Sequence, residues 1–314
     1  MKRIVYVLLA VVVIFSFTAC DKTVETEKTG YEMADEICRN LTGYYAGRKL
    51  TDYKEAAALC AAGFDMTSCD WSALVAAPST GLKSYTEFLI SVYFLGKAGC
   101  DVSECDTERY LGYLNKYLDD TDSISTTELS KIVIALMLYE RDFDMTSVAD
   151  NLLTRQDAVS GGFYDYPIIG GETATINIEA AAFALMAYQT IRPAVWSAKY
   201  NDTINDSTMI YLFYQINEDN SFTVNDYYGK ASASATAVCL TSLLSAGMTT
   251  EGDNALCLLN GVNTFTLTDA GKFAGYKEYS ADQIANADAT AYALLCAVTV
   301  KYGNPLTEKK ADIN

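Results

Sequence analysis

The pattern of apolar and polar positions is helical along almost the whole chain. Runs that alternate residue by residue are scarce, and only four prolines interrupt the sequence. Six segments are rich in alanine, leucine and other small residues on every face, which is typical of buried helices. They cover residues 53–62, 84–98, 126–140, 176–190, 231–246 and 287–300. Segments with a single apolar face alternate with them, at 31–42, 70–77, 104–118, 145–155, 204–216 and 251–260.

The alternating segments are related in sequence, which indicates internal repeats. "FDMTS" occurs at 64–68 and again at 143–147, and "GCDVSEC" at 99–105 also follows a buried segment. Later in the chain, "QDAVSGGF" at 156–163 aligns without gaps on "QINEDNSF" at 215–222, and "TDAGKF" at 268–273 shares the final Phe. The buried segments that follow then align Asn177 with Ser232 and Asn286, and Glu179 with Ser234 and Asp288.

A single helical hairpin cannot bury a helix that is apolar on all sides. Six hairpins arranged with their apolar helices as an inner ring and the others as an outer ring would bury all of them. The sequence therefore predicts an all-α (α/α)6 toroid over residues 30–303. An open right-handed solenoid of helical pairs is the alternative, and the count of six hairpins favours the closed ring.

The later hairpins carry a motif found in a known superfamily. A glutamine ends an outer segment, a glycine-rich turn and an aromatic residue follow, and the next inner segment has the form T-A-x-A-L. This motif resembles the repeats of the terpenoid cyclase and protein prenyltransferase toroids, with Phe in place of the cyclase tryptophan and one additional residue between glutamine and aromatic. The resemblance covers residues 150–303 and extends to the first three hairpins only through helix periodicity. It implies the toroid fold.

The catalytic residues of that superfamily are absent. Its zinc site uses an Asp-x-Cys pair and a histidine, whereas the corresponding inner segments begin "NIE", "SAS" and "NAD" and the chain has no histidine. Neither the Asp-x-Asp-Asp acid of cyclases nor a Cys-Gly-Glu-Gln thioester string occurs, and the nearest acidic string, "DDTD" at 119–122, falls between helices. We therefore expect no metal site and no bound cofactor.

The N-terminus predicts export. Lys2 and Arg3 precede an apolar run from Ile4 to Phe17, and "FTAC" ends at Cys20. This resembles the lipobox of bacterial lipoproteins, which implies removal of residues 1–19, lipid attachment at Cys20 and anchoring to the outer face of the cell membrane. An ordinary signal peptide cut nearby is the alternative. We expect residues 20–29 to be a tether and residues 304–314 a C-terminal tail.

Charge and cysteine content add two expectations. The formal net charge of −17 becomes −19 when residues 1–19 and their two cations are removed, and so acidic a body repels nucleic acid. Of the nine cysteines, Cys60 with Cys69 and Cys100 with Cys105 are the pairs best suited to disulfides in an oxidising compartment. Cysteines inside the apolar runs are expected to be buried thiols.

The expected ligand-binding surface is the rim where the inner helices begin. Acidic or polar residues occupy these first turns, at Glu55, Glu87, Glu128, Glu179, Ser234 and Asp288. The loops leading into the last three inner helices add Tyr164, Asp165, Tyr166, Asp226, Tyr227, Tyr228, Tyr276 and Tyr279. Tyrosine provides a large contact area with a polar end, and loops on a rigid scaffold commonly bind ligands. Alternatively, these acidic residues only stabilise the first turns of the helices, and the tyrosines only cover the core.

Two classes of function fit these features. In the first, a non-catalytic surface lipoprotein binds a small molecule, a glycan or a protein at the rim; cobalamin carriers of the same superfamily set the precedent, so a cobalamin-like ligand is included. In the second, the chain is a carbohydrate-active glycosidase or lyase with two facing carboxylates about 5–10 Å apart. Glu179 or Asp288 opposite Glu55 or Glu128 are the candidates for that pair. A terpenoid-related enzyme is a further alternative.

Overall fold

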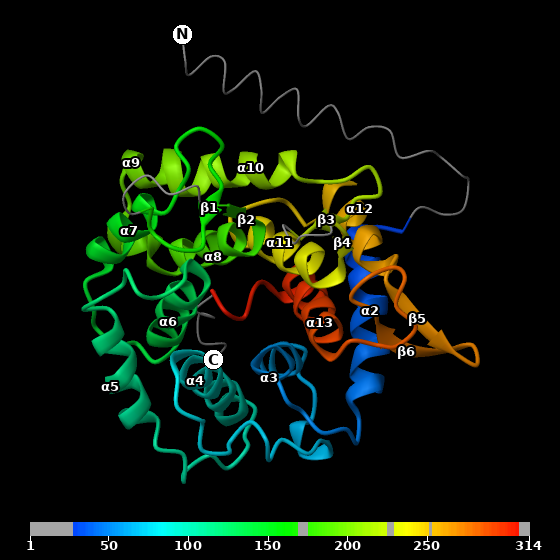
Figure 1. The fold of residues 1–314 in the computed structure, drawn as a ribbon. Helices are drawn as coiled ribbons and strands as arrows, with labels where there is room; N and C mark the ends of the chain where they lie inside the picture. The colour runs from blue at the N-terminus through cyan, green and yellow to red at the C-terminus, as the bar shows by residue number, and fades with distance from the viewer. Residues whose placement is uncertain (1–27, 169–174, 225–228, 251–252, 308–314) are drawn as a thin grey trace.

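The helices form two concentric rings. The computed structural model describes residues 28–168, 175–224, 229–250 and 253–307 (Figure 1). The inner ring consists of α3 (Tyr53–Ala61), α4 (Leu82–Lys97), α6 (Thr126–Leu138), α8 (Ile178–Val195), α11 (Ala233–Ser245) and α13 (Ala287–Tyr302). Each inner helix packs on the next, and α13 packs on α3. The predicted (α/α)6 toroid is confirmed, and the ring is closed.

The outer ring has one helix fewer than the sequence predicts. It consists of α2 (Gly30–Tyr45), α5 (Thr107–Tyr117), α7 (Met145–Thr154), α10 (Thr208–Tyr214) and α12 (Asp253–Asn263). Residues 70–77 were expected to be a sixth outer helix but form turns after the short η1 (Met66–Ser68). The Asp70 carboxylate accepts a hydrogen bond from the Ser72 N–H at 3.0 Å, and the Asp70 backbone pairs with residues 48–50. These bonds favour a turn over a helix start.

Small residues allow the inner helices to pack closely. The first half of α8 has fully buried alanines at positions 180, 181, 182 and 184, and α13 has buried alanines at 291, 293 and 297. Segment α9 (Ala198–Tyr200) and the π-helical η2 (Asn201–Ser207) lead into α10 on the outside. Among the described residues, no helix combines the length and the apolar character needed to cross a bilayer.

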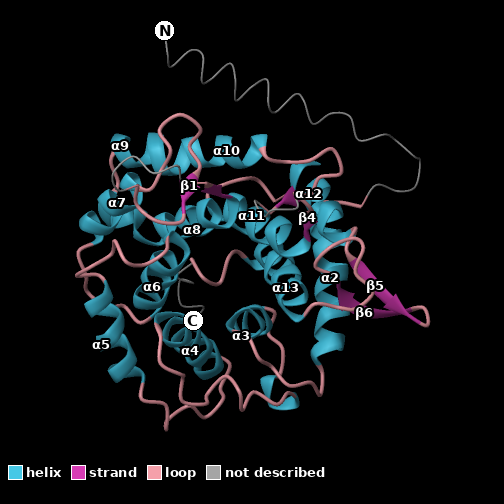
Figure 2. Ribbon diagram, in the orientation of Figure 1, coloured by secondary structure: helices cyan, strands magenta, loops and turns pink. Residues whose placement is uncertain are grey.

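Among the described residues, two-stranded antiparallel sheets occupy the three loops of the repeat motif (Figure 2). They pair β1 (Phe163–Tyr164) with β2 (Ile176–Asn177), β3 (Phe222–Thr223) with β4 (Ala231–Ser232), and β5 (Thr266–Asp269) with β6 (Lys272–Tyr276). In the first two, a buried Phe lies opposite the residue that caps the next inner helix: Phe163 opposite Asn177, and Phe222 opposite Ser232. The motif therefore positions the start of the inner helix.

The gapless alignment of the motif is off by one residue. Gln156 bridges to Phe163, but Ile216 and not Gln215 bridges to Phe222, so the first turn contains one additional residue. Gln156 Nε2 donates to the Gly161 carbonyl at 3.0 Å and to Thr208 Oγ1 at 2.9 Å. The glutamine therefore ties the end of an outer helix to its turn, as predicted, and also to the next outer helix.

The third copy of the motif ends at Tyr276 and not at Phe273. The Tyr276 N–H donates to Thr290 Oγ1 at 3.0 Å, just as the Phe222 N–H donates to Thr236 Oγ1 at 2.9 Å. Tyr276 is 1% exposed. Its side chain is therefore the buried aromatic of this repeat.

The loops lock neighbouring hairpins together. The Thr126 N–H, at the start of α6, donates to the Asp165 carbonyl at 2.6 Å, and the Ala233 N–H, at the start of α11, donates to the Glu278 carbonyl at 2.9 Å. Unpaired N–H groups at helix starts need such acceptors. In both cases, a carbonyl in the loop after an outer helix thus accepts a hydrogen bond from an N–H group at the start of the preceding inner helix.

Arg155, within the motif, is a further tie between hairpins. Its side chain is completely buried at the end of α7 and donates to the Ile124 carbonyl at 2.8 Å and the Thr121 carbonyl at 2.5 Å. Burial lowers its pKa to about 10. The guanidinium therefore connects α7 to the loop that precedes α6.

The segment after α13 lies across the end of the inner ring at which the inner helices finish (Figure 1). Asn304 and Leu306 are buried, and Asn304 Nδ2 donates to Ser245 Oγ, at the end of α11, at 2.8 Å. At the same edge of the ring, Lys301 forms an ion pair with Asp35 of α2. The first and last hairpins are therefore joined by charge as well as by packing.

The expected disulfides are not formed. All eight cysteines of the described residues are thiols, including Cys60, Cys69, Cys100 and Cys105. The Cys69 thiol instead donates to the Tyr45 carbonyl at 3.2 Å. Burial raises the pKa of the Cys69, Cys100 and Cys105 thiols, which keeps them protonated and unreactive.

Candidate functional site

Charged side chains from five inner helices and one loop come together where the inner helices begin. We call this group the mouth cluster. It consists of Lys54 on α3, Glu87 on α4, Lys131 on α6, Glu179 on α8, Asp288 on α13 and Glu278 from the loop after β6. Two cations and four carboxylates therefore share the amino-terminal end of the ring.

Lys54 is the most buried charge in the cluster. Its side chain is 4% exposed, and Nζ lies 2.8 Å from Asp52 Oδ2 and 2.7 Å from Asp288 Oδ1. Nζ also lies 4.4 Å from the centre of the Tyr292 ring. Burial disfavours the charged form, but Tyr53 and the two carboxylates outweigh it and raise the pKa of Lys54. The lysine is therefore a fixed cation that holds Asp288 in place.

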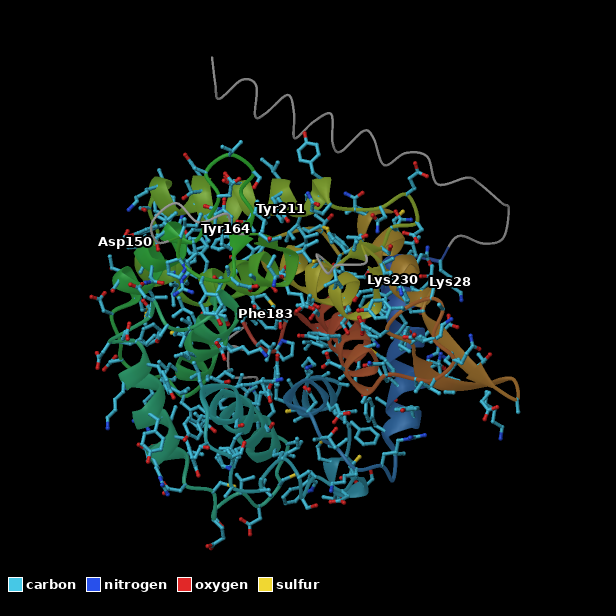
Figure 3. All side chains as sticks on the ribbon, viewed as in Figure 1. Lys28, Asp150, Tyr164, Phe183, Tyr211 and Lys230 are labelled. Carbon is cyan, nitrogen blue, oxygen red and sulfur yellow. The ribbon has the colours of Figure 1, made fainter. Side chains whose placement is uncertain are left out.

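The positive charge of Lys131 is less well balanced by nearby carboxylates than that of Lys54. Its Nζ lies 3.7 Å from Glu87 Oε1 and 5.2 Å from the centre of the Phe183 ring, and its side chain is 12% exposed. Burial lowers its pKa, and the positive charge of Lys54 lowers it further. Figure 3 shows Phe183 near the middle of the ring, so Lys131 lies on the inner side of α6.

Glu179 carries a carboxyl whose proton is held more tightly than usual. Burial raises its pKa, and the negative charges of Asp288 and Glu278 raise it further, while Lys131 and Lys54 oppose them. Asp288, by contrast, is 54% exposed at its side chain and ion-paired with Lys54. The two carboxyl groups thus lie in different environments, Glu179 buried near other carboxylates and Asp288 exposed beside a cation.

Glu278 links the mouth cluster to the repeat motif. Its carboxylate accepts hydrogen bonds from the Ser232 hydroxyl and, at 2.5 Å, from Ser234 Oγ. Both serines lie at the start of α11. The position at which the other copies place Glu179 and Asp288 is therefore occupied here by a serine whose hydroxyl binds a carboxylate supplied by a loop.

Tyr53 contributes a buried hydroxyl without a hydrogen-bond partner in the described part of the chain. The residue is 1% exposed, and its ring centre lies 4.8 Å from Lys54 Nζ and 5.4 Å from Lys131 Nζ. An unsatisfied buried hydroxyl costs about 1–3 kcal/mol. Within the described residues, this polar atom is thus left for a ligand or water to satisfy.

Two of the carboxylates proposed for a facing pair act as helix caps instead. Glu55 accepts from the N–H groups of Thr51 at 2.6 Å and Asp52 at 3.0 Å. Glu128 accepts from the Ser125 N–H at 3.1 Å in the capping box of α6. Their oxygens are directed at the backbone, so the alternative in which acids only stabilise helix starts is correct for these two.

The loop residues expected at the rim have mixed placements. Tyr276 is buried and donates from its hydroxyl to Asn263 Oδ1 at 2.9 Å, so it does not reach the rim. Tyr164 donates to Asp157 Oδ1 at 3.1 Å, and the Asp165 carboxylate accepts from Asn177 Nδ2 at 3.0 Å. Tyr166 is exposed.

Of the other residues predicted for the rim and the lipid anchor, the structure describes Tyr279 alone. Tyr279 is half-buried, and its ring lies 5.7 Å from Lys230 Nζ. Asp226, Tyr227, Tyr228 and the predicted lipidation site Cys20 lie outside the described residues. Their roles stay predictions.

Sequence reasoning missed Lys54, Lys131, Tyr53 and Glu278. A single lysine or tyrosine in an alanine-rich helix gives little sign of its direction, and Glu278 lies in a loop. One signal was present: Lys54 and Lys131 both interrupt segments that are otherwise suited to complete burial. Among the described residues, no group of three or more histidine, cysteine or acidic side chains could hold a metal ion.

No family model matches the sequence, and a search of curated proteins finds no relative. Solved structures, in contrast, are similar over most of the chain. A family 105 glycoside hydrolase from Clostridium acetobutylicum matches with a TM-score of 0.57 and 13% identity, covering 88% of this chain and 99% of that one. An unsaturated glucuronyl hydrolase variant from Streptococcus agalactiae matches with a TM-score of 0.55 and 11% identity, covering 89% and 96%.

A third similar structure is the family 76 α-mannanase BT2949 from Bacteroides thetaiotaomicron. Its TM-score is 0.53 at 11% identity, with 85% of this chain and 86% of that one covered. At such identities the likeness establishes the fold alone. The chain therefore has the (α/α)6 toroid fold of carbohydrate-active enzymes. The resemblance to terpenoid cyclases and prenyltransferases is confirmed only as far as the toroid itself.

Proposed function

We propose that this protein is a carbohydrate-active enzyme that cleaves a glycosidic bond at the mouth cluster. The observation that carries the proposal is the contrast between Glu179, whose pKa is raised by burial and by neighbouring carboxylates, and Asp288, which is ion-paired with Lys54. Glycosidases commonly use two carboxyl groups in such unlike environments. The toroid fold shared with glycoside hydrolases adds support.

In the proposed reaction, the protonated Glu179 donates its proton to the glycosidic oxygen as the bond to the sugar breaks. Asp288, ion-paired with Lys54, stabilises the positive charge that develops on the sugar ring and directs the attacking water. Glu179 is the residue that must be neutral, so its raised pKa suits the acid role.

Tyr53 and Lys131 would bind the substrate. The Tyr53 hydroxyl needs a partner, and sugar hydroxyls provide both donors and acceptors. Lys131 has one carboxylate, Glu87, at 3.7 Å, which leaves its other N–H groups for an oxygen of the ligand. Together they would hold the sugar beside the two carboxyl groups.

The test is a cleavage assay with the wild type and Glu179→Gln on a panel of neutral and acidic oligosaccharides, detecting new reducing ends. We expect the substitution to lower the rate about 10²–10⁴-fold. Glu128→Gln is the matched control, because glutamine retains the cap of α6. Binding without cleavage by the wild type would instead support the non-catalytic binding protein.

We also propose that the protein is exported and held at the outer face of the bacterial membrane by lipid at Cys20. The proposal rests on the apolar N-terminal run followed by "FTAC". In cells fed a radiolabelled fatty acid, the wild type should incorporate label and Cys20→Ala should not. Equal labelling of both would contradict the anchor, whatever the outcome of the cleavage assay.

A further inference from the structure

A hollow lies between α4 of the inner ring and α5 of the outer ring. It is lined by Tyr85 of α4 and by Tyr113, Lys116 and Tyr117 of α5, and its volume is about 340 Å³. We call it the tyrosine groove. The volume falls within the range of small-ligand sites.

Packed rings fix the walls of the tyrosine groove. The Tyr85 ring centre lies 5.3 Å from that of Tyr110 and 5.4 Å from that of Tyr113. Tyr110 in turn packs edge-on against the buried Phe88 at 5.1 Å. The aromatic surface is therefore held rigid before any ligand arrives, which lowers the entropy lost on binding.

Two cations border the same rings. Arg109 Nε donates to the Tyr113 hydroxyl at 3.1 Å, and Lys116 Nζ lies 5.9 Å from the Tyr113 ring centre. Within the described residues, neither cation forms an ion pair. The nearby Glu108 is paired with Arg141. The acid that acts on Arg109 is Asp106, the residue that caps α5, so Arg109 and Lys116 are two cations beside the tyrosine groove in a chain of net charge −17.

We propose that the tyrosine groove binds sugar units that carry carboxylates, as a distal subsite for the chain whose end is cleaved at the mouth cluster. The C–H face of a sugar ring packs favourably on the negative face of an aromatic ring. Arg109 and Lys116 then meet the carboxylates. Screening by salt makes these nearby cations matter more than the distant acidic surface.

The position of Tyr85 links the groove to the mouth. Tyr85 lies in the first turn of α4, and Glu87 of the mouth cluster follows two residues later. Residues two apart on a helix point to different sides. A sugar chain that crosses the amino-terminal end of α4 would therefore pass from the groove to the mouth.

The inference rests on the proposed function, and titration calorimetry with oligogalacturonate tests it. Tyr113→Ala and Lys116→Glu should each weaken binding at least about tenfold, while Tyr214→Ala, which removes an exposed tyrosine on α10, should not. The methyl-esterified oligomer should bind the wild type about tenfold more weakly. Equal affinity of wild type and Lys116→Glu, or of acid and ester, would overturn the proposal. Because Lys116 is exposed, its variant retains the fold.

The two proposals fail separately. If Glu179→Gln and the wild type show no difference in cleavage but the groove variants lose affinity, the mouth assignment is wrong and the groove stands as a binding site. If cleavage depends on Glu179 and the groove variants bind as the wild type does, the groove proposal is wrong and the proposed function stands.

Discussion

The ring of Tyr53 lies beside two lysines in the interior, and its buried hydroxyl has no partner among the described residues. Folding alone does not favour such a hydroxyl, because a buried donor without an acceptor is destabilising. A phenylalanine at position 53 would pack as well as the tyrosine ring and would bury no unsatisfied hydroxyl. Because Tyr53, unlike Tyr188, also packs against Lys54 and Lys131 of the mouth cluster, we take its hydroxyl as a ligand-binding group.

Tyr53→Phe should leave the free energy of unfolding unchanged or raise it by about 1 kcal/mol, because it removes an unsatisfied group. The same change should raise KM roughly tenfold, with the sugar losing one hydrogen bond. Tyr188→Phe is the control, since Tyr188 also has a buried hydroxyl without a partner in the described part of the chain but, unlike Tyr53, is not packed against Lys54 and Lys131. Equal KM values for Tyr53→Phe and wild type would remove Tyr53 from the site.

Glu179 should make stability depend on pH. Because its pKa is higher in the folded than in the unfolded chain, the folded state retains the proton longer, and stability falls as pH rises between the two values. Glu179→Gln should therefore be more stable than the wild type at neutral pH. The difference should vanish below the ordinary carboxyl pKa of about 4.3. Urea unfolding at several pH values measures this, and a less stable variant at neutral pH would contradict it.

Single residues were also where sequence reasoning succeeded least. Glu179 and Asp288 were found because the repeats align them at inner-helix starts. Lys54 and Lys131 were missed because an isolated lysine usually lies on the surface, and only the folded ring brings Lys131 of α6 to Tyr53 of α3.

At the level of elements, the motif loops set the geometry of the mouth. Asn177 accepts hydrogen bonds from the N–H groups of Glu179 at 2.8 Å and Ala180 at 3.3 Å, and its amide donates to both oxygens of Asp165. The same residue therefore caps α8 and holds the start of the loop that follows β1.

Asn177→Ala should lower the free energy of unfolding by about 2 kcal/mol, because both the cap and the bond to Asp165 are lost. Asn286→Ala should cost about 1 kcal/mol, since Asn286 caps α13 through the Ala289 N–H alone. Chemical denaturation of both variants checks the order. If Asn286→Ala proved the costlier change, the link between Asn177 and Asp165 would not be stabilising.

The inner helices could be predicted because a helix that is apolar on all sides has a distinctive composition, and all six were located within a few residues. The outer helices were harder to predict from the sequence. Residues 70–77 have amphipathic spacing, but the local Asp70–Ser72 turn prevails over it. The offset at Gln156 and the role of Tyr276 depend on hydrogen bonds to a neighbouring helix, which a sequence alignment does not contain.

For the whole molecule, closure of the ring distinguishes the toroid from an open solenoid. Helix α13 packs on α11, α3 and α2, and so joins the last hairpin to the first. In an open repeat array, a terminal hairpin can be removed at modest cost. In a closed ring, its removal exposes the apolar sides of three helices.

Deleting residues 287–314 should therefore abolish the cooperative thermal transition, whereas deleting residues 308–314 should preserve it. Circular dichroism during heating distinguishes these outcomes. If the chain without α13 melted cooperatively within a few degrees of the full chain, the ring would not behave as one folding unit.

The central claim is that Glu179 is the acid of a glycosidic cleavage at the mouth, and the pH dependence of kcat/KM tests it most directly. For the wild type, activity should fall as pH rises through the pKa of Glu179, which burial and the neighbouring carboxylates raise above that of an ordinary glutamate. Glu278→Gln removes one of the charges that raises this pKa, while glutamine can still accept from Ser234. The account predicts that this limb moves to lower pH in Glu278→Gln. A limb that lies at the ordinary carboxyl pKa, or that does not move, would contradict it.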